Sequence, residues 1–311
     1  MRTFAVMFLA GSALASWAWH DTGHMVIGRI AEREMTADPA KVNALLANLP
    51  AKDAAEGSFG YPTLGAGSLG SGPELAGQPS ALDWASVWPD KVRRTWMDRP
   101  DWHYINYPVL GPGGKAPAER PGNVEKAIVA MVEFAKNTGN PANSRAVALA
   151  WVCHLIGDLH MPLHATAYYS SLHPEGDRGG NIFFLRKDPV THKWEPRKDW
   201  NLHTFWDKMG KAEDLGVSVI LDRVLDLNFG TPRYTNLNQI QANVGAWARE
   251  SLQIAKTSAY KEVKNGWLVP LSPFATTVSP EYQRRAQEVS LERVNQAGRR
   301  LAAVIDYIFR D

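Results

Sequence analysis

Most of the chain repeats its apolar residues with a helical period, and this pattern predicts a mainly α-helical fold. A stretch of strand-forming residues at 181–194 predicts one small β-hairpin. Stretches rich in glycine and proline at 54–79 and 108–122 predict long loops. Since no linker or repeat divides the helical segments, we expect a single compact helical domain. The expected helices span residues 24–35, 39–49, 81–94, 124–136, 144–159, 202–209, 212–225, 237–259 and 280–309.

The first residues have the pattern of a secretory signal peptide. A positive start at Arg2 is followed by a mostly apolar run and then by small residues that end at Ala18. The run is shorter than the roughly 18 apolar residues that a membrane span needs, and no other segment reaches that length. We therefore expect residues 1–18 to be removed, with a cut after Ala15 as the alternative. Residues 19–311 would then form a secreted or periplasmic protein.

Charge and cysteine content exclude two classes of protein. The chain has 34 basic and 32 acidic side chains, which excludes a protein that grips nucleic acid with a broad basic surface. Its single cysteine, Cys153, cannot form a disulfide within the chain, which excludes a disulfide-stabilised secreted scaffold. We expect Cys153 to be a small buried hydrophobic residue rather than a nucleophile.

Two pairs of histidine and aspartate are spaced to share a helix face. His154 and Asp158 lie four residues apart, and His203 and Asp207 repeat that spacing. His164 follows the first pair just after a proline turn. Imidazole and carboxylate are ligands that Zn²⁺ takes besides thiolate. One such pair alone is more often a hydrogen-bonded pair within a helix, but two pairs beside a third histidine indicate a metal site.

Three further residues have ordinary interpretations when each is taken alone. Asp90, in an aromatic helix, is typical of a surface or capping carboxylate. His103, between two aromatic residues, is typical of a half-buried histidine with satisfied hydrogen bonds, and His24 of a solvated residue at a helix start. The remaining histidines, which we also interpret as ordinary, are His20, His160, His173 and His192.

Taken together, these residues resemble the S-one/P-one (S1/P1) type nucleases, the single-strand-preferring zinc-dependent endonucleases. The resemblance rests on several motifs that occur in the family's order between residues 19 and 207. The final third of the chain is only generically helical. The motifs are Trp19 with His24 five residues later, Trp88-Pro-Asp90-x-x-Arg93, His103-Tyr104-Ile105-Asn106, His154-x-x-Gly157-Asp158-x-x-x-Pro162-Leu163-His164, Gly179-Gly180-Asn181 and Asn201-Leu-His203-x-x-Trp206-Asp207.

The resemblance implies a helical domain of the phospholipase C and P-one nuclease type that holds three Zn²⁺ ions. Its implied ligands are Asp90, His103, His154 and Asp158 for one zinc, His164, His203 and Asp207 for the second, and the amino group and carbonyl of Trp19 with His24 and the bridging Asp158 for the third. Because the last site needs a free amino group on Trp19, it favours cleavage after Ala18.

The resemblance also implies a reaction. Metal-activated hydroxide, oriented with the help of Asp90, attacks phosphorus and leaves 5′-phosphate products. Arg93 contacts the phosphate and stabilises charge in the transition state. The implied substrates are single-stranded DNA and RNA, with 3′-nucleotides as further substrates of a monomeric enzyme.

Three polar or aromatic residues are implied contacts of the substrate. Tyr104 matches a ring on which a base stacks, and stacking tolerates any base sequence. Asn106 departs from many relatives, which have Asp at this place, so it predicts an altered or broadened base preference. It also suits an ordinary turn, and Asn181 suits either the substrate side of the site or the start of the expected hairpin.

Two other functions remain open at this point. A phosphodiesterase related to zinc phospholipase C shares the fold and the terminal Trp ligand, although the matches at Arg93, Tyr104 and residues 201–207 favour the nuclease. A non-catalytic zinc-binding protein is the second alternative, although such proteins usually have His-rich tracts, and the candidate ligands here are dispersed.

Overall fold

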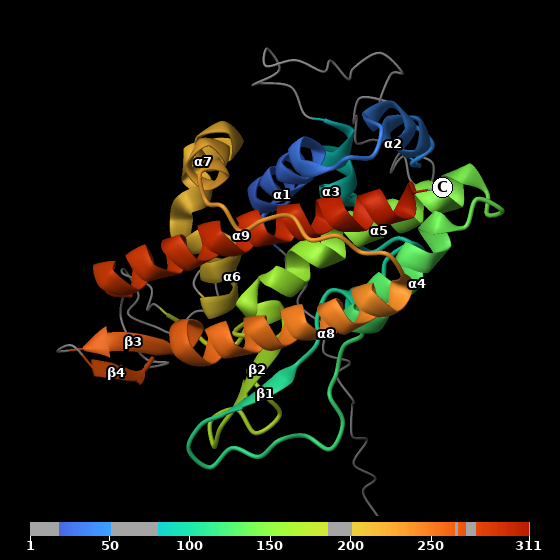
Figure 1. Cartoon of the computed structure of the whole chain (residues 1–311). Helices are drawn as coiled ribbons and strands as arrows, with labels where there is room; N and C mark the ends of the chain where they lie inside the picture. Colours follow the sequence, from blue (N-terminus) through green and yellow to red (C-terminus); the bar gives the residue numbers. More distant parts are fainter. Residues whose placement is uncertain (1–18, 51–79, 186–200, 265–266, 272–277, 311) are drawn as a thin grey trace, which may run out of the picture.

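The computed structural model describes residues 19–50, 80–185, 201–264, 267–271 and 278–310. Within these residues the chain is mainly helical, which confirms the predicted fold class (Figure 1). The expected signal peptide, the loop expected at 54–79 and the part of the expected hairpin after residue 185 lie outside the described residues.

Most helices begin and end within a few residues of the prediction, and one agrees at both ends. The α-helices are α1 (Asp21–Glu34), α2 (Pro39–Leu46), α3 (Ala81–Lys91), α4 (Val124–Lys136), α5 (Ala142–His160), α6 (Leu202–Asp207), α7 (Gly216–Leu225), α8 (Leu237–Ile254) and α9 (Pro280–Ile308). Short helical turns are η2 (Pro100–Trp102), η3 (Pro162–His164), η5 (Met209–Leu215) and the π-helical η6 (Ala255–Ala259). The strands are β1 (Tyr107–Leu110), β2 (Thr166–Tyr169), β3 (Lys261–Lys264) and β4 (Trp267–Pro270).

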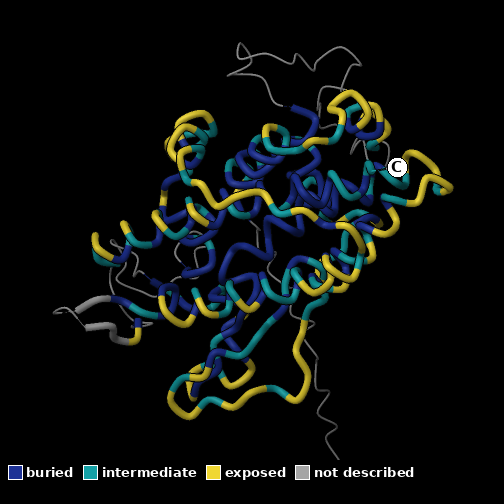
Figure 2. The backbone as a smooth tube through the Cα atoms, viewed as in Figure 1, coloured by how far each residue is buried: buried dark blue, intermediate teal, exposed yellow. Residues whose placement is uncertain are grey.

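Helix α5 runs through the centre of the molecule and is buried without interruption from Ala148 to His160. It packs against α1, α3, α4, α8 and α9, and the centre of the view in Figure 2 is correspondingly dark blue. A helix that is covered on every side needs an apolar circumference rather than an apolar stripe. The histidine and aspartate residues of its buried stretch, His154, Asp158 and His160, are therefore carried into the core.

Helix α1 is held against both α3 and α9 by packing and by charge pairs. Arg29 donates to the buried Asp83 at the start of α3, with 2.6 Å between Nε and Oδ2. Arg299 of α9 donates to Glu34 at the end of α1, at 2.8 Å. These contacts fix α1 relative to its neighbours, and α1 carries His24 into the interior.

Strands β1 and β2 pair in parallel, with Tyr107 opposite Thr166. Just before the pair, Ile105 N donates to His164 O at 2.8 Å. The segment after η2 therefore lies beside η3, although about 60 residues separate them in the chain. The loop expected at 108–122 therefore begins with strand β1. Local hairpin signals in the sequence do not reveal this strand, because its partner β2 is remote in the chain.

The last part of the chain differs from the prediction in three places. The α-helix expected at 212–225 begins only at Gly216, because residues 212–215 belong to the 3-10 turn η5 and Gly216 has a positive φ of 78° that separates this turn from α7. The helix expected at 237–259 changes to a π-turn after Ile254. A hairpin of β3 and β4 follows at 261–270.

At the hairpin position expected at 181–194, the described residues show one antiparallel bridge, between Phe184 and Asn201.

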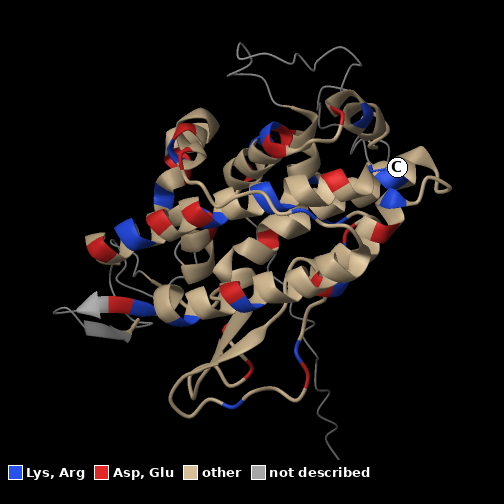
Figure 3. Ribbon diagram, in the orientation of Figure 1, with Lys and Arg blue, Asp and Glu red and all other residues tan. Residues whose placement is uncertain are grey.

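Acidic and basic side chains are interspersed along the helices in the view of Figure 3. This mixture agrees with the nearly balanced charge of the sequence. Among the described helices, none combines the length and the apolar character that crossing a membrane requires.

Candidate metal centre

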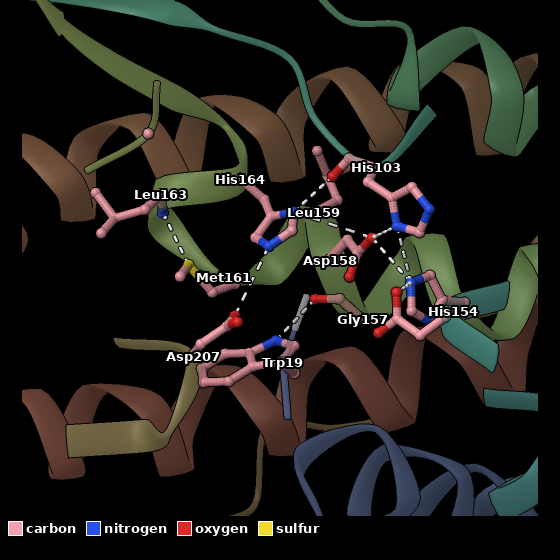
Figure 4. A network of polar contacts seen from close by, with 12 residues as sticks. Trp19, His103, His154, Gly157, Asp158, Leu159, Met161, Leu163, His164 and Asp207 are labelled. Atoms are coloured by element: carbon pink, nitrogen blue, oxygen red, sulfur yellow. Dashed lines mark hydrogen bonds and ion pairs between the residues drawn. The ribbon is translucent and has the colours of Figure 1, made fainter. Parts of the chain in front are cut away.

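The eight histidine and aspartate side chains expected as metal ligands are all buried. The most exposed of them, Asp90, has 7% of its surface accessible. They come from segments that are far apart in the sequence, and Figure 4 shows several of them converging around Asp158. Burying so many ionisable groups is costly unless they bind one another or a cation. The residues are His24, Asp90, His103, His154, Asp158, His164, His203 and Asp207.

Asp158 is the centre of this cluster. Its Oδ2 lies 3.0 Å from His103 Nδ1 and 3.2 Å from His154 Nε2. Its Oδ1 lies 3.3 Å from His24 Nε2, and His164 Nδ1 is 3.9 Å from Oδ2. Burial alone would raise the pKa of Asp158, but His154 and His164 outweigh burial and hold the pKa well below its ordinary value. The carboxylate is therefore ionised, as a bridging ligand must be.

Three groups of side chains bring potential ligand atoms within 4.8 Å of one another. Two of the groups share His154, and the third lies on the other side of Asp158 in the sequence. The group at His164 contains the three residues of one implied zinc site, whereas the group at Asp90 does not include Asp158 and the group at His24 includes His154. The groups are His24 with His154 and Asp158, Asp90 with His103 and His154, and His164 with His203 and Asp207.

Several atoms of these groups are buried without a hydrogen bond. They include both ring nitrogens of His24, Nε2 of His103, Nε2 of His164 and Oδ1 of Asp207. A buried polar atom left in this state costs about 1–3 kcal/mol. His164 Nε2 faces Asp207 Oδ1 at 3.7 Å, too far for a hydrogen bond. Nitrogen and carboxylate donors that converge in this way fit divalent cations, so the donor set is suited to metal.

The second ring nitrogen of three histidines is held by a backbone carbonyl. His154 Nδ1 lies 2.8 Å from Ser86 O, and His164 Nδ1 lies 2.6 Å from His103 O. His203 Nδ1 lies 2.7 Å from Gly179 O. A ring whose Nδ1–H donates to a carbonyl keeps its Nε2 lone pair for a metal, as metal-binding histidines usually do.

The carbonyl that holds His203 belongs to a turn organised by Asp177, which sequence reasoning missed. The fully buried Asp177 carboxylate accepts from Tyr168 N at 2.8 Å and from the Tyr260 hydroxyl at 2.8 Å. Burial raises the pKa of Asp177 to about 6. Gly179 has a φ of +64°, and a Cβ there would lie 2.4 Å from Leu163 O. The only signal in the sequence is an aspartate two residues before the glycine pair, and Tyr260 leaves none.

Asn181 is the last residue of this turn. It is half-buried, and its side-chain amide donates to Arg178 O at 2.9 Å. Asn181 therefore lies in the turn whose Gly179 carbonyl accepts the hydrogen bond from His203.

His24 is fully buried, so its interpretation as a solvated helix-start residue is wrong. Its ring stacks on that of His154 with 4.1 Å between centroids. A Cβ at Gly157 would lie 2.8 Å from His24 Nδ1, so only glycine lets α1 and α5 approach this closely. The helix pattern places His24 near a helix start, but the crossing of two helices decides its burial.

Trp19 lies beside this crossing. Its side chain is fully buried, and its indole Nε1 donates to Gly157 O at 2.9 Å (Figure 4). The next residue, His20, donates its backbone N–H to Asp207 O at 3.2 Å. Residues 19 and 20 therefore lie between the turn that carries Asp158 and the helix that carries Asp207.

Asp90 is also buried, so its interpretation as a surface carboxylate is wrong. It lies at the end of α3, and its Oδ1 accepts from Arg93 Nε at 2.7 Å. Burial would raise the pKa of Asp90, but His154 and Arg93 outweigh burial and lower it to about 2. The terminal nitrogen Nη2 of Arg93 is buried without a hydrogen bond. Asp90 and Arg93 thus form an ionised pair at the edge of the cluster.

The two expected base contacts follow His103 directly. Tyr104 and Asn106 are both half-buried, and Asn106 N donates to Pro121 O at 3.0 Å. His103 itself is 3% exposed and its Nε2 has no hydrogen bond, so its interpretation as a half-buried histidine with satisfied hydrogen bonds is wrong.

Two residues on α5 have the ordinary roles expected of them. Cys153 is buried, and burial raises the pKa of its thiol to about 12, which confirms that it is a small core residue. His160 lies outside all three groups, although it is fully buried.

Comparison with known proteins gives one consistent result. A family model of the S1/P1 nucleases matches residues 19–310. Endonuclease 1 of Arabidopsis thaliana is 26% identical over 94% of this chain and 88% of its own length. Endonuclease 2 of the same plant is 27% identical over 94% and 90%, and Endonuclease 4 is 27% identical over 73% and 77%. The similarity thus extends well beyond the motifs between residues 19 and 207.

Proposed function

Because the chain belongs to the S1/P1 nuclease family, we propose that it is a secreted, zinc-dependent endonuclease of single-stranded DNA and RNA. Its products would carry a 5′-phosphate, and 3′-nucleotides would also lose their phosphate. The observation that carries this proposal is the convergence of eight buried histidine and aspartate side chains, with Asp158 at their centre and Arg93 beside Asp90. We further propose that the enzyme is a monomer that works after residues 1–18 are removed.

Imidazole and carboxylate donors without thiolate support zinc as the metal. Zinc bound here would lower the pKa of a water molecule and polarise a phosphate oxygen. The residues that would hold three zinc ions are Asp90, His103, His154 and Asp158 for the first, His164, His203 and Asp207 for the second, and His24, Asp158 and the terminal amino group and carbonyl of Trp19 for the third.

The reaction adds water to phosphorus and breaks the bond from phosphorus to the 3′ oxygen. Asp90 orients the attacking water by accepting a hydrogen bond from it. With a pKa of about 2, Asp90 is ionised at neutral pH and acts as an acceptor only. It therefore positions the water rather than storing its proton.

Arg93 binds the phosphate that is attacked. Its Nε–H is held by Asp90 at 2.7 Å, which orients the guanidinium, and its Nη2 has no hydrogen bond. A guanidinium held in this way donates two aligned hydrogen bonds to phosphate and stabilises the charge that develops in the transition state. The salt bridge with Asp90 thus preorganises the donor.

Half-buried side chains beside the cluster contact the base. The ring of Tyr104 offers a stacking surface, and the amide of Asn106 both donates to and accepts from base edges. Asn181 lies in the turn that holds His203, and from there it supports the substrate side of the metal centre.

The test is to assay the purified chain starting at Trp19 on single-stranded DNA, RNA and phosphatidylcholine, with zinc content measured on the same sample. We expect hydrolysis of both nucleic acids and about three zinc ions per chain. Hydrolysis of the lipid alone would show a phosphodiesterase like zinc phospholipase C. Bound zinc without hydrolysis of any phosphodiester would show a non-catalytic zinc protein.

A further inference from the structure

A hollow lined by aromatic rings lies next to the metal centre. It is a groove of about 420 Å³ between the segment 96–102 and helices α4 and α5. Trp96 on its rim is 75% exposed, and Phe134 is 37% exposed. Trp102 and Trp151 line the groove and meet edge to face, with centroids 5.1 Å apart. Large aromatic side chains left in solvent in this way mark a binding surface.

The groove and the metal centre share a wall. Trp151 contacts the ring of His103 edge to face, with 5.4 Å between centroids. Trp102 directly precedes His103 in the chain, and Trp96 follows Arg93 by three residues. A strand bound at the metal centre therefore has the groove within reach of an adjacent part of its chain.

The charge of the groove suits a polyanion. Arg99 is the one charged residue among its described lining residues, and its guanidinium lies 5.8 Å from the centre of the Trp102 ring. Arg99 donates to the backbone carbonyl of Trp96 at 2.9 Å, which holds the positive group close to the residue with the exposed ring. No carboxylate is among the described lining residues, so Arg99 gives the lining of the groove a positive charge that attracts phosphate.

From this arrangement we propose that the groove is a second base-binding subsite, which rests on the nuclease function proposed above. It takes one unpaired base of the substrate strand at a nucleotide away from the phosphate that is cut. The base stacks on Trp96 and lies against the rings of Trp102 and Phe134, and Arg99 contacts the adjoining phosphate. A volume of about 420 Å³ accommodates a group of this size.

The test compares Trp96→Ala with the wild-type holoenzyme on two substrates, a single strand of about 12 thymidine nucleotides and a 3′-mononucleotide. We expect the KM for the strand to rise about tenfold with kcat unchanged, because a stacked base is lost. The KM for the mononucleotide is expected to stay the same, because that substrate does not reach the groove. Trp96→Phe should restore most of the affinity, and Arg99→Gln should weaken strand binding more at low salt than at high salt.

The matched control is Phe229→Ala, which removes an aromatic side chain that is 44% exposed and lines a different pocket. It should leave both KM values unchanged. Equal KM values of Trp96→Ala and wild type on the strand would overturn the subsite. Conversion of a wild-type dimer to a monomer by Trp96→Ala, with an unchanged KM, would overturn it in favour of an interface between copies of the chain. Failure of the wild-type enzyme to cut nucleic acid would instead refute the proposed function.

Discussion

Helix α5 carries two buried histidine clusters that look alike in the sequence and differ in the structure. On one side, His154 and Asp158 belong to the metal centre, where several ring and carboxylate atoms have no hydrogen bond. On the other side, His160 is equally buried, but its Nδ1 donates to Ile156 O at 2.7 Å and its Nε2 accepts from Arg300 at 2.8 Å. Burial and residue type do not separate the two clusters, whereas hydrogen-bond satisfaction does.

The polar side chains around His160 satisfy one another's hydrogen bonds. Arg300 and Arg293 both pair with Glu250, at 2.6 Å and 2.9 Å. Arg293 also donates to the Ser251 hydroxyl at 3.0 Å. The cluster therefore ties α5, α8 and α9 together without any bound ion. In the Asp158 cluster several buried atoms lack such partners, and a divalent cation would satisfy them.

The largest expected effect comes from removing the bridging carboxylate. Asp158→Asn keeps the shape but loses the charge that two proposed zinc sites share. We expect nuclease activity to fall about a thousandfold or more, because several kcal/mol of transition-state stabilisation are lost with the metals. Zinc analysis should show about two fewer ions per chain. Near-normal activity of this variant would place the active site elsewhere.

The matching change on the other side of α5 is His160→Ala. It leaves Arg300 without one of its acceptors and opens a cavity, so we expect the free energy of unfolding to fall by roughly 3–4 kcal/mol. Zinc content and kcat should stay within about twofold of wild type, because His160 belongs to none of the three candidate ligand groups. Urea unfolding and metal analysis of the same samples check both parts. Loss of zinc without loss of stability would reverse the comparison.

Asp177 is an intermediate case, since its carboxylate is satisfied by hydrogen bonds but supports a ligand histidine. Its pKa is raised from 3.8 to about 6 in the folded chain, so folding binds protons between these pH values. Its contribution to stability is therefore complete below pH 4 and declines as the pH rises through 6, by roughly 3 kcal/mol in total. The measurement is urea unfolding of the metal-free wild type and Asp177→Asn between pH 4 and 7. A stability difference between them that does not change with pH would contradict this account.

The smallest expected effect tests the terminal ligand. A chain with one or two residues added before Trp19 keeps every side chain of the cluster but moves the free amino group away. We expect the loss of about one zinc per chain and a fall of about tenfold in activity. The chain that starts at Trp19 is the control. Three zinc ions and full turnover in the extended chain would show that the amino group is not a ligand.

The elements that follow from local pattern could be predicted from the sequence. Helix α4 has the predicted bounds because its apolar stripe faces the core over its whole length. The i, i+4 spacing of His154 and Asp158 likewise requires no tertiary information. The family motifs extended this reasoning to His24 and Asp90, which local interpretation alone had placed at the surface.

Elements that depend on remote partners could not be predicted in this way. Strand β1 forms because residues 166–169 lie beside it, and the kink before α7 depends on the positive φ angles of residues 209–211 and 216. Asp177 has no spacing signal, since its role comes from Tyr168 and Tyr260 folding over it.

The sequence by itself determined the helical fold class, because helical periodicity is a local property of a chain, and its family motifs predicted the list of metal-binding side chains. Only the tertiary structure decided which of the buried histidines remain without partners. That outcome depends on helix crossings such as the close approach of Gly157 to His24, and on charges brought from α9 to His160. Hydrogen-bond satisfaction is a property of the packed core, so it separates the metal centre from the structural cluster of His160, whose partners the sequence does not show.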